Sequence, residues 1–519
     1  MEKNMDYDKA ILGIELGSTR IKAVVLNENL KVAARGSFEW ENKLVNGIWT
    51  YSMDEVINGI RACYCDLTDN MCMCPSRYAA IGISGMMHGY LPFNEKWELL
   101  AEFRTWRNSI TAGAADALTR EFDFNIPQRW SIAHLYQAIL NGEEHVKDVA
   151  HITTLSGYIH FLLTGENAVG IGEASGMFPI DSRNKCYRRD MLERFDSMSG
   201  LNRKVETLLP KVLVAGSAAG ELSPSGAALL DPSGKLKSGI PMAPCEGDAG
   251  TGMVATNSVR FHTGNVSAGT SVFSMIVTDH SLSVHKEIDM VTTPNGHPAA
   301  MVHCSNCSSD MNAWVGLFSE LLKYMGKRTE KGELFTRLFE KALEGSPECG
   351  DLLSYNYYSG ESITAVDVGC PVFLRTPDSD FTLSNFMRMH IQSAFATLRI
   401  GMDILRREGV RIEHLCAHGG IFKTPIVAQR LLSAAMGVPV LIMETAGEGG
   451  AYGMALLASY MLNRTENETL EDYLDDKVFA SVETSRLMAS SEDIEGFAEF
   501  MARYVKAFVV EKAAAESLL

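Results

Sequence analysis

Two short stretches of the chain place polar residues where chemistry could take place. The first, "GIELGSTRIKAVVL" (residues 13–26), carries Glu15, Gly17, Ser18, Thr19 and Arg20 between two apolar runs. A turn rich in glycine and hydroxyl groups suits a phosphate, although a plain β-hairpin with a polar turn is the simpler interpretation of this stretch alone. The second, "APCEGDAGTGM" (residues 243–253), brackets Asp248 with glycines, which let a substrate approach closely. Aspartate in a glycine-rich run is also common turn chemistry.

The first stretch has a counterpart near the middle of the chain. "GNVSAGTSVFSMIV" (residues 264–277) is again an apolar run, a small polar turn and an apolar run. Two similar phosphate-type turns about 250 residues apart are typical of a duplicated α/β unit that grips one nucleotide.

The elements that must position these turns alternate between strands and helices. We expect strands at "ILGIELG", "IKAVVL" and "YAAIGIS", an extended segment at "VAARGSFEW", and a helix at "SMDEVINGIRACYCDL" with Ser52 as its N-cap. The run of residues 414–444 predicts strand, glycine turn, helix and strand, with Thr424 as N-cap, Pro425 at the first helical position and Gly437 just past the helix end. This order predicts an α/β fold with mostly parallel sheets covered on both faces, and ligands at the carboxyl ends of strands.

Composition narrows the classes of partner. The chain has 519 residues, enough for two or more domains, and a formal net charge of −17 with no block of Lys and Arg, which argues against nucleic acid and favours a small molecule. The N-terminus is polar, and no apolar run is long enough to cross a bilayer, so we expect a cytoplasmic protein with no membrane partner.

The 11 cysteines fit a reducing compartment better than a disulfide framework. Cys63, Cys65, Cys72 and Cys74 could supply four thiolates, but their C-x-C spacing is not that of structural zinc sites, and burial as small apolar residues is the simpler interpretation. Cys304 and Cys307 have C-x-x-C spacing without a second pair; packing is favoured over a redox role.

Taken together, the motifs resemble the FGGY family of carbohydrate kinases from about Ile11 to Tyr460. The matching segments, in the family's order, are "GIELGSTRIKAVVL", "GISGMMHG", "FRTWRN", "LTGENAVGIGEASGMFPID", "EGDAGTG", "SAGTS", "HGGIFKTP" and "EGGAYGMALLA". The resemblance implies two actin-like (RNase H-like) domains with an active-site cleft between them, which we expect at residues 1–258 and 259–519.

The resemblance also implies roles for individual residues. Asp248 matches the catalytic aspartate, the general base that helps a sugar hydroxyl attack the γ-phosphate of ATP. Mg²⁺ is expected because kinases use it to bridge phosphate oxygens, and the implied carboxylates are Glu15 and Asp248. The nucleotide is implied to lie against three groups of residues: Gly17, Ser18, Thr19, Arg20 and Lys22; Gly269 and Thr270; and Gly419, Gly420 and Lys423.

For the acceptor, Met87 and His88 match the Met-His pair of the xylulokinase-like branch, which favours a ketose over glycerol. Trp106 and Asn108 match the second part of the sugar site, although core packing would explain Met87 and Trp106 as well. The chain departs from the family at Glu15, where aspartate is usual, and at Met86, where glutamine is usual. A further departure is "WRNS", where a Trp-Asn-Asp run is usual, and the departures around the acceptor site suggest a sugar outside the commonest ones.

The leading hypothesis is an ATP-dependent kinase of a ketose such as a xylulose- or ribulose-type pentulose, with a homodimer as one assembly that the sequence allows. Two alternatives stay open at this point: an actin-like ATPase switch that acts on a protein partner, and a catalytically silent sugar-binding relative. A nucleotide switch has no need for "MMHG" and "TWRN", and tight sugar binding without ATP turnover would identify a silent relative.

Overall fold

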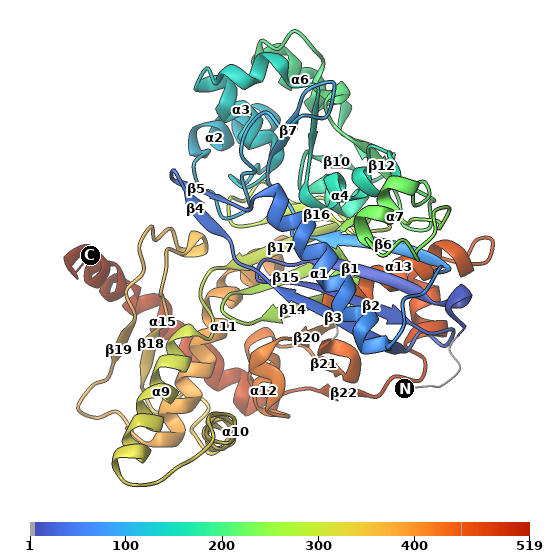
Figure 1. Cartoon of the computed structure of the whole chain (residues 1–519). Coiled ribbons are helices and arrows are strands. Elements are labelled where there is room, and N and C mark those ends of the chain that lie inside the picture. The colour runs from blue at the N-terminus through green and yellow to red at the C-terminus, as the bar shows by residue number, and fades with distance from the viewer. Residues whose placement is uncertain (1–5, 448, 519) are drawn as a thin grey trace. The chain divides into compact units, whose positions relative to one another are not determined.

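The computed structural model describes residues 6–447 and 449–518 and divides into two units, each with its own core (Figure 1). Of the described chain, the first unit takes residues 6–260, 279–299 and 449–481, and the second takes 261–278, 300–447 and 482–518. The chain therefore leaves the first unit close to the expected boundary at residue 258, but two later segments return to it. The functional division into 1–258 and 259–519 stays a prediction.

The main sheet of the first unit has the strand order β13-β6-β1-β2-β3. Its strands are β1 (Ile11–Leu16), β2 (Arg20–Leu26), β3 (Val32–Glu39), β6 (Ala80–Gly85) and β13 (Glu246–Gly247). The β1–β2 and β2–β3 pairs are antiparallel, whereas β6 runs parallel to both β1 and β13. The expected strands are confirmed, but the expectation of a mostly parallel sheet is wrong, because short hairpins connect the first three strands.

Two helices cover the opposite faces of this sheet, and glycines let both come close. Helix α1 (Met53–Met71) begins at its predicted N-cap Ser52, whose hydroxyl accepts from the Glu55 N–H, and it packs on β3. Helix α13 (Gly449–Asn463) packs on β1 and β6. A Cβ on Gly13 would lie 2.1 Å from the Ala451 carbonyl oxygen, and one on Gly36 would lie 2.5 Å from the Cys63 carbonyl oxygen. Backbone contact of this kind excludes any larger residue at Gly13 and Gly36.

The remaining elements of the first unit are shorter. The strands are β4 (Lys43–Val45), β5 (Ile48–Thr50), β7 (Leu91–Phe93), β8 (His151–Thr153), β9 (Ala168–Gly170), β10 (Ile180–Asp181), β11 (Cys186–Tyr187), β12 (Lys211–Leu213) and β16 (Asp289–Thr292). The helices are α2 (Ala112–Phe122), α3 (Ser131–Leu140), α4 (Leu155–Thr164), α5 (Ile171–Ser175), α6 (Arg189–Ser199), α7 (Pro224–Leu230), α8 (Asp248–Ala255) and α14 (Leu470–Tyr473).

The second unit repeats the hairpin and the parallel pairing of the first. Its sheet runs β17-β15-β14-β20-β21-β22, formed by β14 (Thr263–Ala268), β15 (Val272–Val277), β17 (Pro298–Cys304), β20 (His414–His418), β21 (Val440–Met443) and β22 (Thr484–Leu487). A separate pair is β18 (Leu353–Tyr355) with β19 (Val372–Leu374). The helices are α9 (Ser309–Tyr324), α10 (Lys331–Ala342), α11 (Leu383–Arg407), α12 (Val427–Met436) and α15 (Ser491–Leu518).

Helix α12 corrects one prediction from sequence. It ends at Gly437 as expected, in the left-handed conformation with φ 65°. Its start is not at Thr424 and Pro425: these follow a short 3₁₀ turn (Gly420–Lys423), and the helix begins at Val427 after Ile426. Thr424 is a residue type that caps helices, but the chain passes through Ile426 in a non-helical conformation with φ 71° before the helix begins.

The cysteines lie at scattered positions, and all eleven are free thiols. Cys63 is buried in α1, Cys65 and Cys72 are exposed, and the Cys74 thiol donates to an Asp231 carboxylate oxygen over 3.4 Å. Cys304 and Cys307 are both buried, and burial raises the pKa of the Cys307 thiol to about 12.

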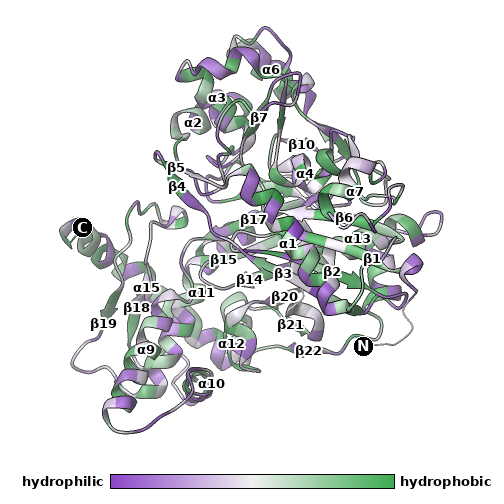
Figure 2. Ribbon diagram, viewed as in Figure 1, coloured by the Kyte–Doolittle hydropathy of each residue, from purple (hydrophilic) through white to green (hydrophobic). Residues whose placement is uncertain are grey.

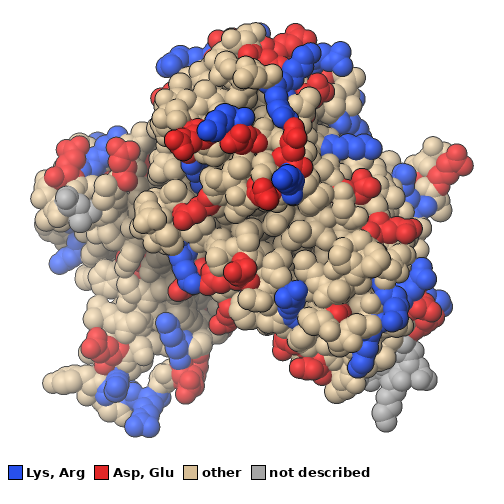
Figure 3. Space-filling view, turned by 45° about the horizontal axis from the view of Figure 1, so that its top comes forward, with Lys and Arg blue, Asp and Glu red and all other residues tan. Residues whose placement is uncertain are grey.

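The surface is charged without segregation of sign on the face seen in Figure 3, where Lys and Arg side chains are interspersed with Asp and Glu. Within the described residues, none of the helices combines the length and the apolar character needed to span a membrane.

Candidate active site

Asp248 lies where β13 ends and α8 begins, half-buried at the first helical position. Its Oδ1 accepts hydrogen bonds from the Met87 N–H over 3.2 Å and from the Ala249 N–H over 3.0 Å. A Cβ on the preceding Gly247 would lie 2.1 Å from the Met87 Cγ, so only glycine lets the two segments meet. Burial, with the Glu15 carboxylate as a second cause, raises the pKa of Asp248 to about 6.

Glu15 lies in β1 between Lys22 of β2 and Ser84 of β6. Its Oε2 is 3.7 Å from the Lys22 Nζ and, within the described chain, is buried without a hydrogen-bond partner. Helix α13 begins against this carboxylate, because a Cβ on Gly450 would lie 2.6 Å from the Glu15 Oε1. The full Glu15 side chain therefore has room here because helix α13 begins with glycines, which carry no Cβ.

The first phosphate-type turn is held by two aromatic side chains. The Trp40 Nε1–H donates to the Gly17 carbonyl oxygen over 2.7 Å, and the Tyr51 hydroxyl donates to the Ser18 carbonyl oxygen. The rings of Trp40 and Tyr51 stack on each other with centroids 4.3 Å apart. The turn therefore keeps its shape without using the hydroxyl groups of Ser18 and Thr19.

The two cations beside this turn differ in their partners. Arg20 forms an exposed ion pair with Glu39, the residue opposite it on β3, whereas Lys22 reaches toward Glu15. Of the two, Lys22 is the cation that the structure brings close to the carboxylates of the site.

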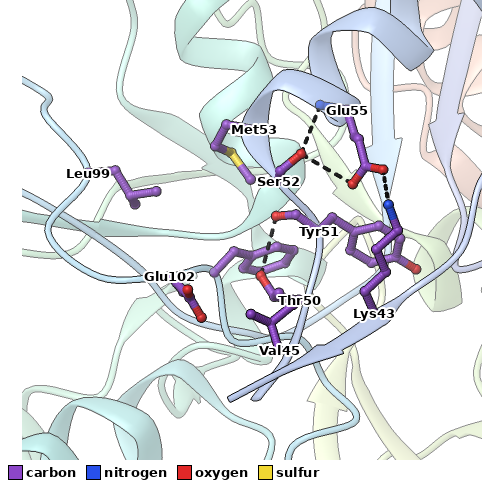
Figure 4. A pocket seen from close by; sticks show the side chains of 10 residues that line it. Lys43, Val45, Thr50, Tyr51, Ser52, Met53, Glu55, Leu99 and Glu102 are labelled. Carbon is purple, nitrogen blue, oxygen red and sulfur yellow. Dashed lines mark hydrogen bonds and ion pairs between the residues drawn. The ribbon is translucent and has the colours of Figure 1, made fainter. Parts of the chain in front are cut away.

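A pocket of about 480 Å³ is lined in part by Tyr51 (Figure 4). Its lining residues come from the β4–β5 hairpin, the start of α1 and a later loop: Lys43, Val45, Thr50, Tyr51, Ser52, Met53, Glu55, Leu99, Glu102 and Phe103. Lys43 and Glu55 form an ion pair at its rim. None of the site residues predicted from sequence lines this pocket.

The predicted sugar loop packs against α5. His88 is buried with φ 69°, its Nδ1 lies 3.1 Å from the Gly176 carbonyl oxygen, and its ring stacks on Trp130. A Cβ on Gly176 would lie 2.6 Å from the His88 Nδ1 and 3.0 Å from the Met87 Cε. The segment "LTGENAVGIGEASGMFPID", which contains Gly176, thus packs directly against Met87 and His88.

Trp106 and Asn108 have different surroundings. Trp106 is half-buried, whereas Asn108 is buried and its amide engages the backbone of Trp49 from both sides, with Oδ1 accepting and Nδ2 donating over 2.8 Å each. Asn108 Nδ2 also donates to the Thr105 carbonyl oxygen over 2.9 Å. Asn108 therefore anchors the segment that carries Trp106, and its role as a sugar ligand stays a prediction.

Two buried carboxyl groups behind Asp248 were not predicted from sequence. Glu246 accepts from the N–H groups of Gly172 and Glu173, and Glu173 Oε1 accepts from the Ser156 hydroxyl over 2.9 Å. Burial raises the pKa of both carboxyl groups to about 8. The second oxygen of Glu173 lies 2.6 Å from where a Cβ on Gly247 would be. The available signal was a glutamate within each motif, "EASG" and "CEGD".

In the second unit, the two predicted nucleotide segments are neighbours. The Gly269 carbonyl oxygen accepts from the Ser308 N–H and hydroxyl, and the Thr270 carbonyl oxygen accepts from the Cys307 N–H. Gly419 has φ 115°, and a Cβ there would lie 2.1 Å from the Ala268 carbonyl oxygen. The loop of exposed Gly419, Gly420 and Lys423 therefore touches the end of β14, just before the second phosphate-type turn.

Each unit is thus an α/β layer structure with a glycine-containing turn between two antiparallel strands, and the first unit adds an aspartate at a helix start. Residues 10–255 match the N-terminal domain, and residues 264–462 the C-terminal domain, of the FGGY family of carbohydrate kinases. The chain belongs to this family: it is a carbohydrate kinase, a phosphotransferase with an alcohol group as acceptor.

Proteins with similar sequences are also carbohydrate kinases. A xylulose kinase of Haemophilus influenzae is 22% identical over 412 residues, 76% of this chain and 78% of the relative. An L-fuculokinase of Escherichia coli is 24% identical over 249 residues, 45% of this chain and 49% of the relative, so that match spans only about half of either protein.

Solved structures of low identity share the fold. The ligand-bound xylulose kinase and the gluconate kinase of Lactobacillus acidophilus both superpose with a TM-score of 0.80 at 15% and 16% identity, covering 98% of this chain and 100% of theirs. The predicted two-domain α/β, actin-like fold class is confirmed. Kinases of this family use ATP and typically a divalent metal ion.

Proposed function

We propose that this kinase phosphorylates a ketose, a pentulose of the xylulose or ribulose type, with Asp248 as the general base. The observation that supports the proposal best is the hydrogen bond from the Met87 N–H to Asp248 Oδ1, which joins the base to the predicted sugar loop. Both hydrogen bonds that other described residues give to this carboxylate end on Oδ1, which leaves Oδ2 for a substrate hydroxyl.

In this mechanism Asp248 accepts the proton of a sugar hydroxyl as that oxygen attacks the γ-phosphorus of ATP, and ADP leaves. A carboxylate with a pKa of about 6 is ionised at neutral pH and a better base than an exposed aspartate. Met87 and His88 form the sugar side of the site, and Trp106 offers an aromatic face to the sugar C–H groups.

We assign the nucleotide to the residues predicted from sequence. Backbone N–H groups and hydroxyl groups of the first turn, with Lys22, bind phosphate oxygens, and Gly269 and Thr270 do the same in the second unit. Gly419 and Gly420 lie along the adenosine, where no Cβ interferes. Arg20 and Lys423 complete the predicted set.

The carboxylates also fit a divalent metal ion. None of the described residues donates a hydrogen bond to the buried Glu15 Oε2, and the charge of this carboxylate raises the pKa of Asp248. Oxygen ligands of this kind are those that Mg²⁺ takes in kinases, so Glu15 and Asp248 would hold the ion. When bound, Mg²⁺ neutralises charge on the phosphate oxygens. Localisation in the cytoplasm stays a prediction.

The test is ADP release from MgATP over a panel of pentuloses, hexuloses, deoxy-sugars, aldoses and polyols. We expect a pentulose to give the highest kcat/KM. Asp248→Asn should lose turnover by at least about a thousandfold while it keeps nucleotide binding by calorimetry, because only the base is removed. Asp148→Asn, an exposed residue, is the matched control and should retain full activity.

Two results would contradict the proposal. A higher kcat/KM for a polyol or an aldose than for every ketose would overturn the substrate class. Normal turnover by the Asp248→Asn variant would show that another group takes the proton.

A further inference from the structure

A buried carboxyl group of the second unit lies close behind the second phosphate-type turn. Glu361 is fully buried, and its Oε2 accepts hydrogen bonds from the Ser305 N–H over 2.9 Å, the Asn306 N–H over 3.3 Å and the Asn306 Nδ2 over 3.2 Å. Burial raises the pKa of Glu361 to about 7, and these N–H donors oppose the rise because they favour the ionised form. The carboxylate thus fixes the start of the loop that joins β17 to α9, residues 305–308, which we call the β17–α9 loop.

The far half of the β17–α9 loop contacts the turn directly. The Cys307 N–H donates to the Thr270 carbonyl oxygen over 2.9 Å. The Ser308 N–H and hydroxyl both donate to the Gly269 carbonyl oxygen, over 3.1 Å and 2.6 Å. Since residues 269–271 connect β14 to β15, the loop holds the carbonyl groups of the turn itself, and the backbone conformation of the turn depends on where the loop lies.

The segment just before Glu361 interlocks with the same loop. Asn306 Oδ1 accepts from the Ser359 N–H over 3.0 Å, and Asn306 Nδ2 donates to the Ser359 carbonyl oxygen over 3.1 Å. Asn356 Nδ2 donates to the Cys307 carbonyl oxygen over 2.7 Å. Both asparagines are buried. Buried polar groups are costly to leave unpaired, so these bonds define one position for the loop.

The two ends of this arrangement are fixed in turn. The Glu361 N–H donates to the Val366 carbonyl oxygen over 2.7 Å, and the Val366 N–H donates back to the Glu361 carbonyl oxygen over 3.1 Å. A Cβ on Gly360 would lie 2.3 Å from the Asp367 carbonyl oxygen, so only glycine fits before Glu361. At its other end the loop leads into α9, whose hydrophobic residues, green in Figure 2, include the buried Met311. The Glu361 carboxylate is therefore a fixed point to which the loop is attached.

We propose that Glu361 is a positioning residue for the nucleotide: it holds the β17–α9 loop, and the loop holds Gly269 and Thr270 in the conformation that binds phosphate. This inference rests on the assignment of the turn to the nucleotide under the proposed function. Glu361 is buried whereas Thr270 is exposed, so the carboxylate acts through the loop and does not touch the ligand. Its removal should weaken the binding of nucleotide and leave the binding of sugar unchanged.

The first test compares the KM for MgATP with the KM for the best sugar of the panel. Glu361→Ala should raise the KM for MgATP by roughly tenfold or more and leave the KM for the sugar within about twofold, because the loop loses its acceptor. Glu361→Gln, whose side-chain oxygen can accept from the same N–H groups, should restore most of the affinity for MgATP. Glu340→Ala, at an exposed glutamate of α10, is the matched control and should behave like the parent.

A milder variant tests the same connection if Glu361→Ala does not fold. Ser308→Ala removes the hydroxyl that donates to the Gly269 carbonyl oxygen and should raise the KM for MgATP by about fivefold. Circular dichroism melts compare the folding of all variants. The proposal is overturned if a folded Glu361→Ala variant keeps the KM of the parent for MgATP, if its two KM values rise equally, or if Ser308→Ala has no effect.

Hydrogen exchange tests the positioning role without any nucleotide or turnover. In Glu361→Ala the amides of residues 269–271 should exchange faster than in the parent protein, since the loop no longer has a fixed start. Unchanged exchange at these amides would also overturn the proposal.

One further variant separates this inference from the proposed function. Gly269→Val adds a side chain where a Cβ would meet no described atom within 4 Å, so it should keep the fold and obstruct MgATP, as measured by calorimetry. If Gly269→Val binds MgATP like the parent, the assignment of this turn to the nucleotide is wrong. If Gly269→Val loses MgATP while Glu361→Ala retains it, the nucleotide assignment holds and only the role of Glu361 is refuted.

Discussion

The pKa of Asp248, the proposed base, is set by its surroundings rather than by its residue type alone. Two backbone N–H groups favour its ionised form, whereas burial and the Glu15 carboxylate oppose it, and the net effect is a pKa of about 6. A base with its pKa just below neutrality is ionised at working pH and still takes a proton from a hydroxyl.

We therefore expect the kcat/KM of the kinase to fall on the acid side with an apparent pKa near 6, because the protonated carboxyl cannot accept a proton. Glu15→Gln removes a neighbouring negative charge and should move this limb to lower pH at saturating Mg²⁺. The measurement is a pH profile of both proteins. A limb that stays in place in the variant would show that Glu15 does not act on the base.

The buried Glu173 makes a prediction about stability. Its pKa of about 8 in the folded state exceeds the ordinary value of 4.5, so ionisation opposes folding, and native stability falls as pH rises from about 4.5 to about 8. Glu173→Gln keeps the shape of the side chain, and its amide N–H group replaces the hydroxyl of the protonated acid as a hydrogen-bond donor. It should be more stable than the parent at pH 8, by on the order of 4 kcal/mol because each pKa unit corresponds to about 1.4 kcal/mol, and equal to it near pH 4.

Denaturant unfolding at both pH values checks this expectation. Glu166→Gln, an exposed residue of the same region, is the control and should leave the pH dependence unchanged. Equal stability of Glu173→Gln and the parent at pH 8 would contradict the assignment of the raised pKa to burial.

The positions of Asp248 at a helix start and of Glu15 near a strand end could be predicted from their motifs, whereas their roles stay predictions. Glu173 and Glu246 could not, since burial of a carboxyl depends on segments that lie far apart in the sequence. Asn108 was predicted by residue type, but which partner its amide finds is decided by the packing of β5 beside it.

At the scale of elements, the close packing of α13 on β1 depends on Gly13. Gly13→Ala would put a methyl group 2.1 Å from the Ala451 carbonyl oxygen, so helix and strand must separate. We expect a loss of about 3 kcal/mol or more in the free energy of unfolding, with reduced activity because α13 begins at Glu15. Chemical denaturation measures the loss.

The matched control is Gly332→Ala in α10, where an added Cβ meets nothing within 4 Å. There alanine should be neutral or slightly stabilising, by up to about 1 kcal/mol, because glycine is a poor helix former. Equal unfolding midpoints for the two variants would mean that α13 and β1 accommodate an added methyl group at Gly13 with little loss of stability.

Elements with local signals were predictable, and those defined by contacts were not. Helix α1 begins after Ser52 as the cap predicted, while α12 starts two residues later than expected because Ile426, directly before it, has φ 71°. The parallel and antiparallel pairings also needed the structure, since the sequence gives the strands but not their neighbours.

At the scale of the molecule, the first unit is built from a long N-terminal segment and two later segments of the chain. A fragment of residues 6–260 lacks α13 and leaves the faces of β1, β6 and α8 uncovered, so we expect it to lack a cooperative unfolding transition. The same fragment followed by a glycine-serine linker and residues 449–481 should regain one. Circular dichroism and calorimetry compare the two. Cooperative unfolding of the shorter fragment would show that α13 is dispensable.

The position of α13 has a consequence for how the enzyme is made. During synthesis β1 is made first, and the helix that packs on Glu15 follows only after residue 449 has been reached. A chain that ends after Asp248 and before Gly449 would contain the proposed base but not helix α13 beside Glu15. The surroundings of Glu15 are therefore complete only in a chain that includes α13, although β1 itself forms near the start of synthesis.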